Sequence, residues 1–200
     1  MSSLLAFGYA GVFLFALVVN LIPFVGPSNL FIAGVAAISI PGANFLTVGL
    51  LVALGSSTAK MIHFSIAFFT SRILNDSQRQ KLNNFSKKAG KIGPLLIFLS
   101  AATPVPDDPV VIPLGLMKYN PVKFFIIYFL GKATITVSGA YLGLFTKVRF
   151  GGLMDGGTMA VISIAVTVVA TILLLKVDLG KSFSSIARRL GLSRSDSATS

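Results

Sequence analysis

The feature that most constrains this chain is a series of long apolar runs that contain almost no charge. Four runs are long enough to cross a bilayer, which takes about 20 mostly apolar residues: Leu4 to Ile22, Phe45 to Thr70, Val122 to Phe145 and Thr158 to Leu175. Hydrophobic residues make up 54% of the chain and charged residues only 12%, unlike a soluble domain. The sequence therefore predicts an all-α integral membrane protein with about four transmembrane helices.

Two further apolar stretches, residues 22–43 and 92–117, are interrupted by prolines. Pro23 and Pro27 break the first stretch, and Pro104, Pro106 and Pro109 break the second. Each proline inside a helix costs roughly 3 kcal/mol, and broken backbone at membrane depth must be covered by protein or by a water-filled cavity. We therefore predict two re-entrant hairpins, each made of two half-helices around a proline-rich turn. Two kinked full spans are the alternative.

The basic residues lie mainly between the apolar runs. The net charge is +11, from 17 Lys and Arg against 6 Asp. If residues 92–117 return to the side from which they enter, 13 basic residues lie on one side of the membrane and two, Lys147 and Arg149, on the other. This asymmetry fits the positive-inside rule and anionic lipid headgroups, so a nucleic-acid partner is not needed to explain the charge.

The resulting topology places both termini in the cytoplasm, in what we expect to be the plasma membrane. Residues 1–180 form a single membrane domain, and residues 181–200 form a basic cytoplasmic tail, partly amphipathic or disordered. The two hairpins would enter from opposite sides and form an inverted repeat, whose broken segments usually meet at the substrate site. Gly139 and Gly143, four residues apart, also predict a close contact between helices.

Asp107 and Asp108 are the most informative pair in the chain, because carboxylates inside membrane segments are costly and mark functional sites. Capping the following half-helix would explain one of them. A second adjacent carboxylate is harder to explain by capping, and neighbouring carboxylates hold a shared proton more tightly. We therefore predict that the pair takes part in proton coupling or cation handling.

Lys60 and Lys132 each lie about 11 residues, or roughly 16 Å, from a helix end, which is deep in the membrane. Both should face the bundle interior, where they either bind an anionic headgroup or pair with Asp107 and Asp108. His63, one turn after Lys60, is a candidate proton relay or a packed, hydrogen-bonded histidine.

Other polar residues have weaker signals. Asn20, Ser28 and Asn29 flank the first turn and are candidates for substrate binding, although caps explain Ser28 and Asn29 equally well. The aromatic run Phe124, Phe125, Tyr128 and Phe129 is expected to be lipid-facing bulk and packing. With one His, no Glu and no Cys, we predict no metal site and no cofactor, and no enzyme template fits the chain.

These residues together resemble the DedA family, also described as VTT or SNARE-associated-type membrane proteins, in a divergent form. The likeness runs from about Asn20 to Gly143 and rests on the spaced residues of the two hairpins: Asn20, Pro23, Pro27 and Gly34, then Thr103-Pro-Val-Pro-Asp-Asp-Pro109, Pro113, Gly115, Met117, Phe124 and Gly131. The resemblance implies opposed re-entrant hairpins and transport of phosphorylated lipids or lipid carriers, often linked to proton motive force.

The chain also departs from the family's pattern. The family commonly carries an acidic residue near the first hairpin and arginines around the second, where this chain has Asn20 and Ser28, and Thr103, Asp107 and Asp108. Lys60 and Lys132 would then supply the positive charge that a phosphate requires.

Three functional hypotheses follow. The first is a flippase or scramblase for phosphorylated lipids, driven by protons, whose partners are anionic or phosphorylated membrane lipids. The second is an exporter or exchanger of a small cation or drug. The third is a non-transporting membrane assembly protein whose buried charges are structural. Each of the three hypotheses is compatible with a homo-oligomer.

Overall fold

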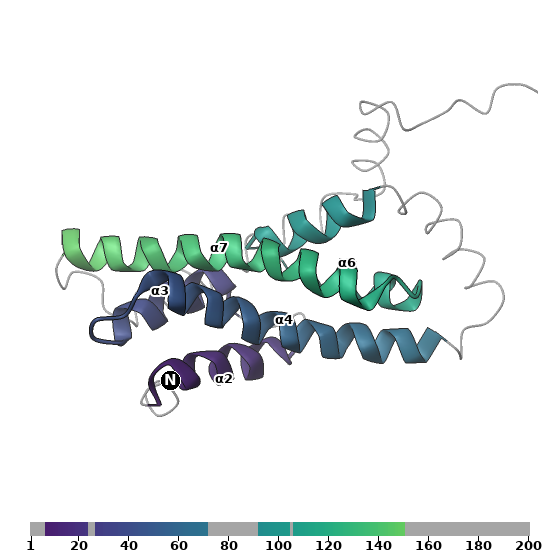
Figure 1. The fold of residues 1–200 in the computed structure, drawn as a ribbon, viewed down its shortest axis with the longest axis horizontal. Coiled ribbons are helices and arrows are strands. Elements are labelled where there is room, and N and C mark those ends of the chain that lie inside the picture. Colours follow the sequence, from purple (N-terminus) through teal and green to yellow (C-terminus); the bar gives the residue numbers. More distant parts are fainter. Residues whose placement is uncertain (1–6, 24–26, 72–91, 105, 151–200) are drawn as a thin grey trace, which may run out of the picture.

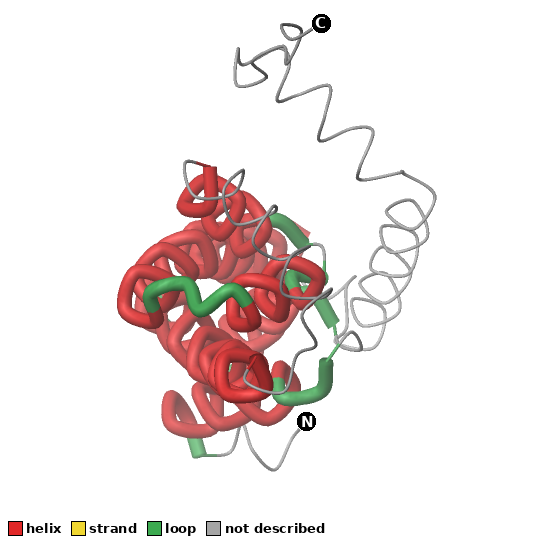
Figure 2. Tube along the Cα trace, turned by 90° about the vertical axis from the view of Figure 1, so that its right-hand side faces the viewer, coloured by secondary structure: helices red, strands yellow, loops and turns green. Residues whose placement is uncertain are grey.

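The computed structural model describes residues 7–23, 27–71, 92–104 and 106–150, and every regular element in these ranges is a helix (Figures 1 and 2). The helices are α2 (Gly8–Asn20), α3 (Asn29–Ser39), α4 (Phe45–Thr70), the unlabelled helix Ile92–Ala102, α6 (Asp108–Leu116) and α7 (Pro121–Phe150). The predicted span 158–175 and the predicted tail 181–200 lie outside the described residues.

Two long helices, α4 and α7, form the centre of the molecule and pack against each other (Figure 1). Each begins at an asparagine. The Asn44 side chain accepts hydrogen bonds from Leu46 N and Thr47 N, and the Asn120 side chain accepts one from Lys123 N. Both α4 and the segment Pro121–Phe145 of α7 are long and apolar enough to cross a membrane, which confirms the two predicted elements at 45–70 and 122–145.

Shorter helices form two hairpins beside this pair. In Figure 1, α2 and α3 lie along one half of the long helices, whereas the teal helix Ile92–Ala102 and α6 lie along the other half. The two turns meet partway along α4, because the His63 side chain contacts both the Leu21 carbonyl and the Asp108 carboxylate. The predicted break around Pro104 and Pro106 is confirmed, and Pro109 lies in the first turn of α6, where proline is tolerated.

The structure corrects the prediction for the first 43 residues. The described residues of the range 22–43 hold one helix, α3, and not two half-helices. The other arm of the hairpin is α2, and Pro23 and Pro27 lie in the connection between the two. The α2 helix has 13 residues, about 20 Å, so it is shorter than the predicted span from Leu4 to Ile22. It starts beside the start of α4, since Asn44 N donates to the Tyr9 hydroxyl at 3.3 Å.

Glycines bring the hairpins close to the long helices. A Cβ atom on Gly139 would collide with the Leu30 carbonyl oxygen of α3, and one on Gly143 would lie 2.5 Å from the Gly34 carbonyl oxygen. The close contact predicted from Gly139 and Gly143 is therefore confirmed as the contact between α7 and α3. Gly115 of α6 approaches the backbone of α4 in the same way, at Phe64 O.

Two apolar cores lie at opposite ends of α4 and α7, with a polar layer between them. Val48 and Val52 of α4 belong to one core and Phe64 to the other, with Ser56, Ser57 and Lys60 in between. The outward face of the long helices is apolar at helical spacing: Leu46, Leu50, Leu54, Ile62 and Ile66 on α4, and Val122, Ile126, Leu130, Tyr141 and Phe145 on α7. Exposed apolar surface of this extent suits a lipid environment.

Candidate functional site: a buried charge cluster between two turns

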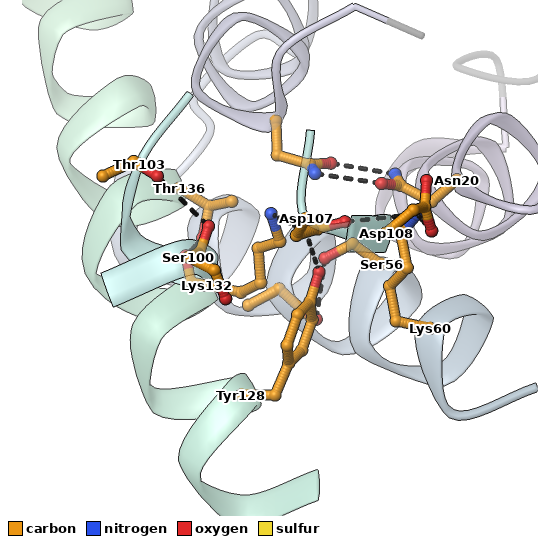
Figure 3. A network of polar contacts seen from close by, with 12 residues as sticks. Asn20, Ser56, Lys60, Ser100, Thr103, Asp107, Asp108, Tyr128, Lys132 and Thr136 are labelled. Carbon is orange, nitrogen blue, oxygen red and sulfur yellow. Dashed lines mark hydrogen bonds and ion pairs between the residues drawn. The ribbon is translucent and has the colours of Figure 1, made fainter. Parts of the chain in front are cut away.

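Asp107 and Asp108 lie at the turn between Ile92–Ala102 and α6, and both are almost completely buried. Asp107 forms ion pairs with Lys132 Nζ of α7 at 2.7 Å and with Lys60 Nζ of α4 at 3.2 Å. Asp108 pairs with Lys60 Nζ at 2.5 Å, and its Oδ1 lies 3.3 Å from His63 Nδ1. We call these five residues together with Tyr128 the central cluster (Figure 3).

Capping does not explain the aspartates. Asp107 occupies the N-cap position of α6, yet its side chain makes no hydrogen bond to the helix. Asp108 is the first residue of that helix, and its carboxylate is directed to α4. Both carboxylates therefore bind cationic side chains of the long helices. Pairing with the aspartates was one of the two roles that the sequence left open for Lys60 and Lys132.

Lys60 and Lys132 are only 4% and 3% exposed, so the prediction that both face the interior is confirmed. With both lysines charged and both aspartates ionised, their four charges cancel. Two ion pairs taken out of water are expensive and persist only with good geometry and further hydrogen bonds. The lysines in this arrangement neutralise the aspartates, and their predicted role in binding a headgroup stays a prediction.

Tyr128 is the member of the cluster that the sequence did not single out. It is fully buried, donates a hydrogen bond from its hydroxyl to Asp107 Oδ2, and has Lys132 Nζ 5.4 Å from its ring centroid. The aromatic run was expected to be lipid-facing bulk and packing. Packing is confirmed for Phe124, which stacks between Phe64 and Tyr128, and the lipid-facing part is wrong for Phe124 and Tyr128, which are both buried. The sequence signal that could have identified Tyr128 is its position four residues before Lys132, on the same helix face.

The two aspartates are held by different helices. Tyr128 and Lys132, one turn apart on α7, bind Asp107 (Figure 3). Lys60 and His63 on α4 bind Asp108. Lys60 is shared, because it also reaches Asp107. This arrangement connects the second turn to both long helices through buried charged and polar groups.

The first turn contributes neutral polar groups. The Asn20 and Asn29 amides form two reciprocal hydrogen bonds of 2.8 and 2.9 Å, and Asn20 also donates to Ala16 O. Asn29 therefore joins the two arms of the hairpin and does not cap α3. Ser28 occupies the N-cap position without a side-chain cap bond, and its hydroxyl is buried with no hydrogen-bond partner among the described residues.

His63 connects the two turns. Its Nε2 lies 3.0 Å from the Leu21 carbonyl oxygen at the first turn, and its Nδ1 faces Asp108 at the second. The described residues hold no group of three or more His, Cys, Asp or Glu side chains placed to bind a metal ion. The site is thus organised around ion pairs and hydrogen bonds, which suits binding of a charged group or exchange of protons.

The fold and this site define a helical membrane protein with a buried charged centre where two helix turns meet. A family model, the VTT domain, matches residues 22–145, and the chain therefore belongs to the DedA family of which this domain is characteristic. The family suggested by the proline and glycine pattern is confirmed over nearly the range that the pattern covers. No curated protein and no solved structure matched the chain.

Proposed function

We propose that this protein moves phosphorylated lipids or lipid carriers between the leaflets of the cell membrane, as a flippase or scramblase without catalytic chemistry. The observation that carries the proposal is the buried, charge-balanced set of Lys60, Lys132, Asp107 and Asp108 at the meeting point of the two turns. Membership of a membrane family often linked to transport supports the same reading.

In this proposal both hairpins are re-entrant. The arms α2, α3, Ile92–Ala102 and α6 have 13, 11, 11 and 9 residues, so each is about 14–20 Å long, against about 30 Å of hydrocarbon. None of these helices spans alone, and a pair with its turn halfway along α4 reaches the membrane centre and returns. Irregular backbone at that depth must be covered by protein, and the described turn residues Leu21 and Asp107 contact α4 and α7 respectively.

Repeated packing supports an inverted repeat. A Cβ on Gly55 of α4 would meet Phe13 O, Ala16 Cβ and Leu17 N of α2. A Cβ on Gly131 of α7 would meet the corresponding three atoms of the other first arm: Phe98 O, Ala101 Cβ and Ala102 N. The same local contact thus joins the first arm of each hairpin to the long helix that follows it, and α4 and α7 run in opposite directions (Figure 1).

This arrangement changes one topological expectation. The basic segment 72–91 orients the end of α4 towards the cytoplasm by the positive-inside rule. Because α2 starts beside the start of α4, we place Gly8 on the external side, in place of the cytoplasmic N-terminus predicted from the sequence. The cytoplasmic C-terminus lies beyond the described residues and stays a prediction.

The charge balance suggests how a phosphate would bind. In the present arrangement both lysines are neutralised, so an anion must compete with Asp107 and Asp108 for them. Protonation of the aspartates would release Lys60 and Lys132 to a phosphate headgroup. Loss of those protons would restore the ion pairs and expel the headgroup, which couples lipid movement to a proton gradient.

The test is transport by purified protein in liposomes. Movement of a fluorescent phosphatidic acid between leaflets is followed with and without a pH gradient, with a phosphatidylcholine probe as the comparison lipid. Wild type is compared with Lys60→Met/Lys132→Met and with Asp107→Asn/Asp108→Asn. Lys123→Gln, an exposed lysine of α7 outside the cluster, is the matched control. Each variant is first checked for folding by size-exclusion chromatography and circular dichroism.

The outcomes separate the hypotheses. Gradient-dependent phosphatidate flux that both double variants lose, and Lys123→Gln keeps, supports the proposal. Flux that ignores the gradient and the aspartates leaves a passive scramblase. Cation flux measured in the same liposomes favours the exporter if it survives neutralisation of the lysines. No flux from folded wild type, with loss of folding in both double variants, favours the structural hypothesis.

A further inference from the structure

His63 lies between two hydrogen-bond acceptors. Its Nε2 is 3.0 Å from the Leu21 carbonyl oxygen, and its Nδ1 is 3.3 Å from Asp108 Oδ1. A backbone carbonyl can only accept, and an ionised carboxylate can only accept. A neutral imidazole carries one N–H, so it can satisfy one of these two partners and must turn a lone pair towards the other. Holding both contacts requires one more proton.

The position of that proton follows from the contact between the Asp108 carboxylate and Lys60. Asp108 Oδ1, the atom that faces His63, also accepts from Lys60 Nζ at 2.5 Å. A proton on Oδ1 would lie next to the ammonium hydrogens that this oxygen already accepts. The proton therefore belongs on the ring, which makes His63 an imidazolium with an N–H directed at each turn.

The other charged and polar groups of the central cluster and the first turn come from four parts of the fold. From α6 and its turn come the carboxylates of Asp107 and Asp108; from α4 comes Lys60; from α7 come Lys132 and Tyr128; and from the first hairpin come the Leu21 carbonyl and the neutral amides of Asn20 and Asn29. Two lysines and two aspartates cancel, so an imidazolium leaves the cluster with one net positive charge.

We propose that His63 is a proton-binding site that joins the two turns, holding one proton between its ring and Asp108 while its other N–H binds Leu21. Loss of the proton turns the His63–Asp108 contact into two facing acceptors and separates the second turn from the first. The proton site stands on geometry alone. Its use in lipid movement rests on the proposed function, and the net positive charge is then the feature that attracts a phosphate.

The experiment uses the fact that His63 is the only histidine in the chain. Full-length protein without a histidine tag, labelled with ¹⁵N-histidine in nanodiscs, gives ring-nitrogen signals from this residue alone. At neutral pH we expect both ring nitrogens of wild type to carry protons.

A matched pair of variants tests the partner. Asp108→Asn removes the charge that faces His63 and should leave a neutral ring with its proton on Nε2. Asp107→Asn makes the same chemical change on the adjacent residue, whose carboxylate contacts Lys60, Lys132 and Tyr128, and should keep both ring protons. A singly protonated wild-type ring at neutral pH would overturn the proposal, as would an equal response to the two variants. The wild-type spectrum decides the question even if a variant fails to fold, and it does not depend on whether lipid transport is observed.

Discussion

At the scale of single residues, the hydrogen bond from the Tyr128 hydroxyl to Asp107 can be removed by a single substitution that changes little else. Tyr128→Phe keeps the ring beside Phe124 and Lys132 but removes the donor to Asp107. A hydrogen bond to a charged group contributes about 1.5–3 kcal/mol, so we expect the free energy of unfolding to fall by that amount. Unfolding in detergent measures it. Tyr141→Phe, on an exposed tyrosine of the same helix, should change little, and an equal loss in both would contradict the assignment.

The Asp107–Lys132 pair gives a second residue-scale prediction. Lys132→Met leaves a buried carboxylate short of one partner and should destabilise the protein by about 3–5 kcal/mol. With Lys60 alone facing two aspartates, one negative charge is uncompensated. Adding Asp107→Asn removes that charge, so the double variant should recover most of this loss. Denaturant unfolding of wild type, the two single variants and the double variant forms a complete cycle. A double variant no more stable than Lys132→Met would show that the pair is not coupled.

At the scale of elements, the contact between α3 and α7 depends on the absence of a side chain. Gly139→Ala places a methyl group against the Leu30 carbonyl, and backbone cannot yield as a flexible side chain does. We expect the two helices to separate at a cost of about 1–3 kcal/mol, seen as a lower thermal unfolding temperature. Ser138→Ala, on the neighbouring exposed position, is the control. An unchanged unfolding temperature in Gly139→Ala would show that this close contact does not stabilise the fold.

The end of α6 gives a prediction of the opposite sign. Lys118 has φ of +54°, with Lys118 N bonded to Gly115 O and Tyr119 N to Leu114 O, the pattern of a Schellman cap. A non-glycine residue in this left-handed conformation costs about 1–2 kcal/mol. Lys118→Gly should therefore stabilise the protein, whereas Lys118→Ala keeps the strained conformation and should not. Thermal unfolding compares the two, and a gain in both would mean that the loss of charge, and not the backbone, is responsible.

At the scale of the whole molecule, the proposed inverted repeat would place the α3–α4 turn and the α6–α7 turn on opposite sides of the membrane. The chain has no cysteine, so single cysteines can be introduced directly. With a membrane-impermeant maleimide, Pro41→Cys and Tyr9→Cys should be labelled in intact cells, and Lys123→Cys only in inverted vesicles. Labelling of Pro41→Cys and Lys123→Cys from the same side would exclude the inverted arrangement, and labelling of Tyr9→Cys only in inverted vesicles would restore the predicted cytoplasmic N-terminus.

The sequence by itself determined the features that depend on local composition. Runs of apolar residues predict α4 and α7 almost to their ends, and prolines predict where the chain breaks, because a proline acts on its own helix. The burial of Lys60 and Lys132 also follows from their depth in apolar runs. The bounds of the two helices in the first hairpin could not be predicted from the sequence. Whether a helix of 13 apolar residues spans the membrane or turns back depends on what it packs against.

Only the tertiary structure decided which groups meet. Lys60 and Asp108 are 48 residues apart, His63 and Leu21 are 42 apart, and Tyr128 and Asp107 are 21 apart. No periodicity links such positions, and a buried tyrosine has the same sequence signal whether its hydroxyl binds a carboxylate or not. The glycine contacts bring the two turns to the same level of α4, and the cost of leaving a buried charge unpaired then selects the partners.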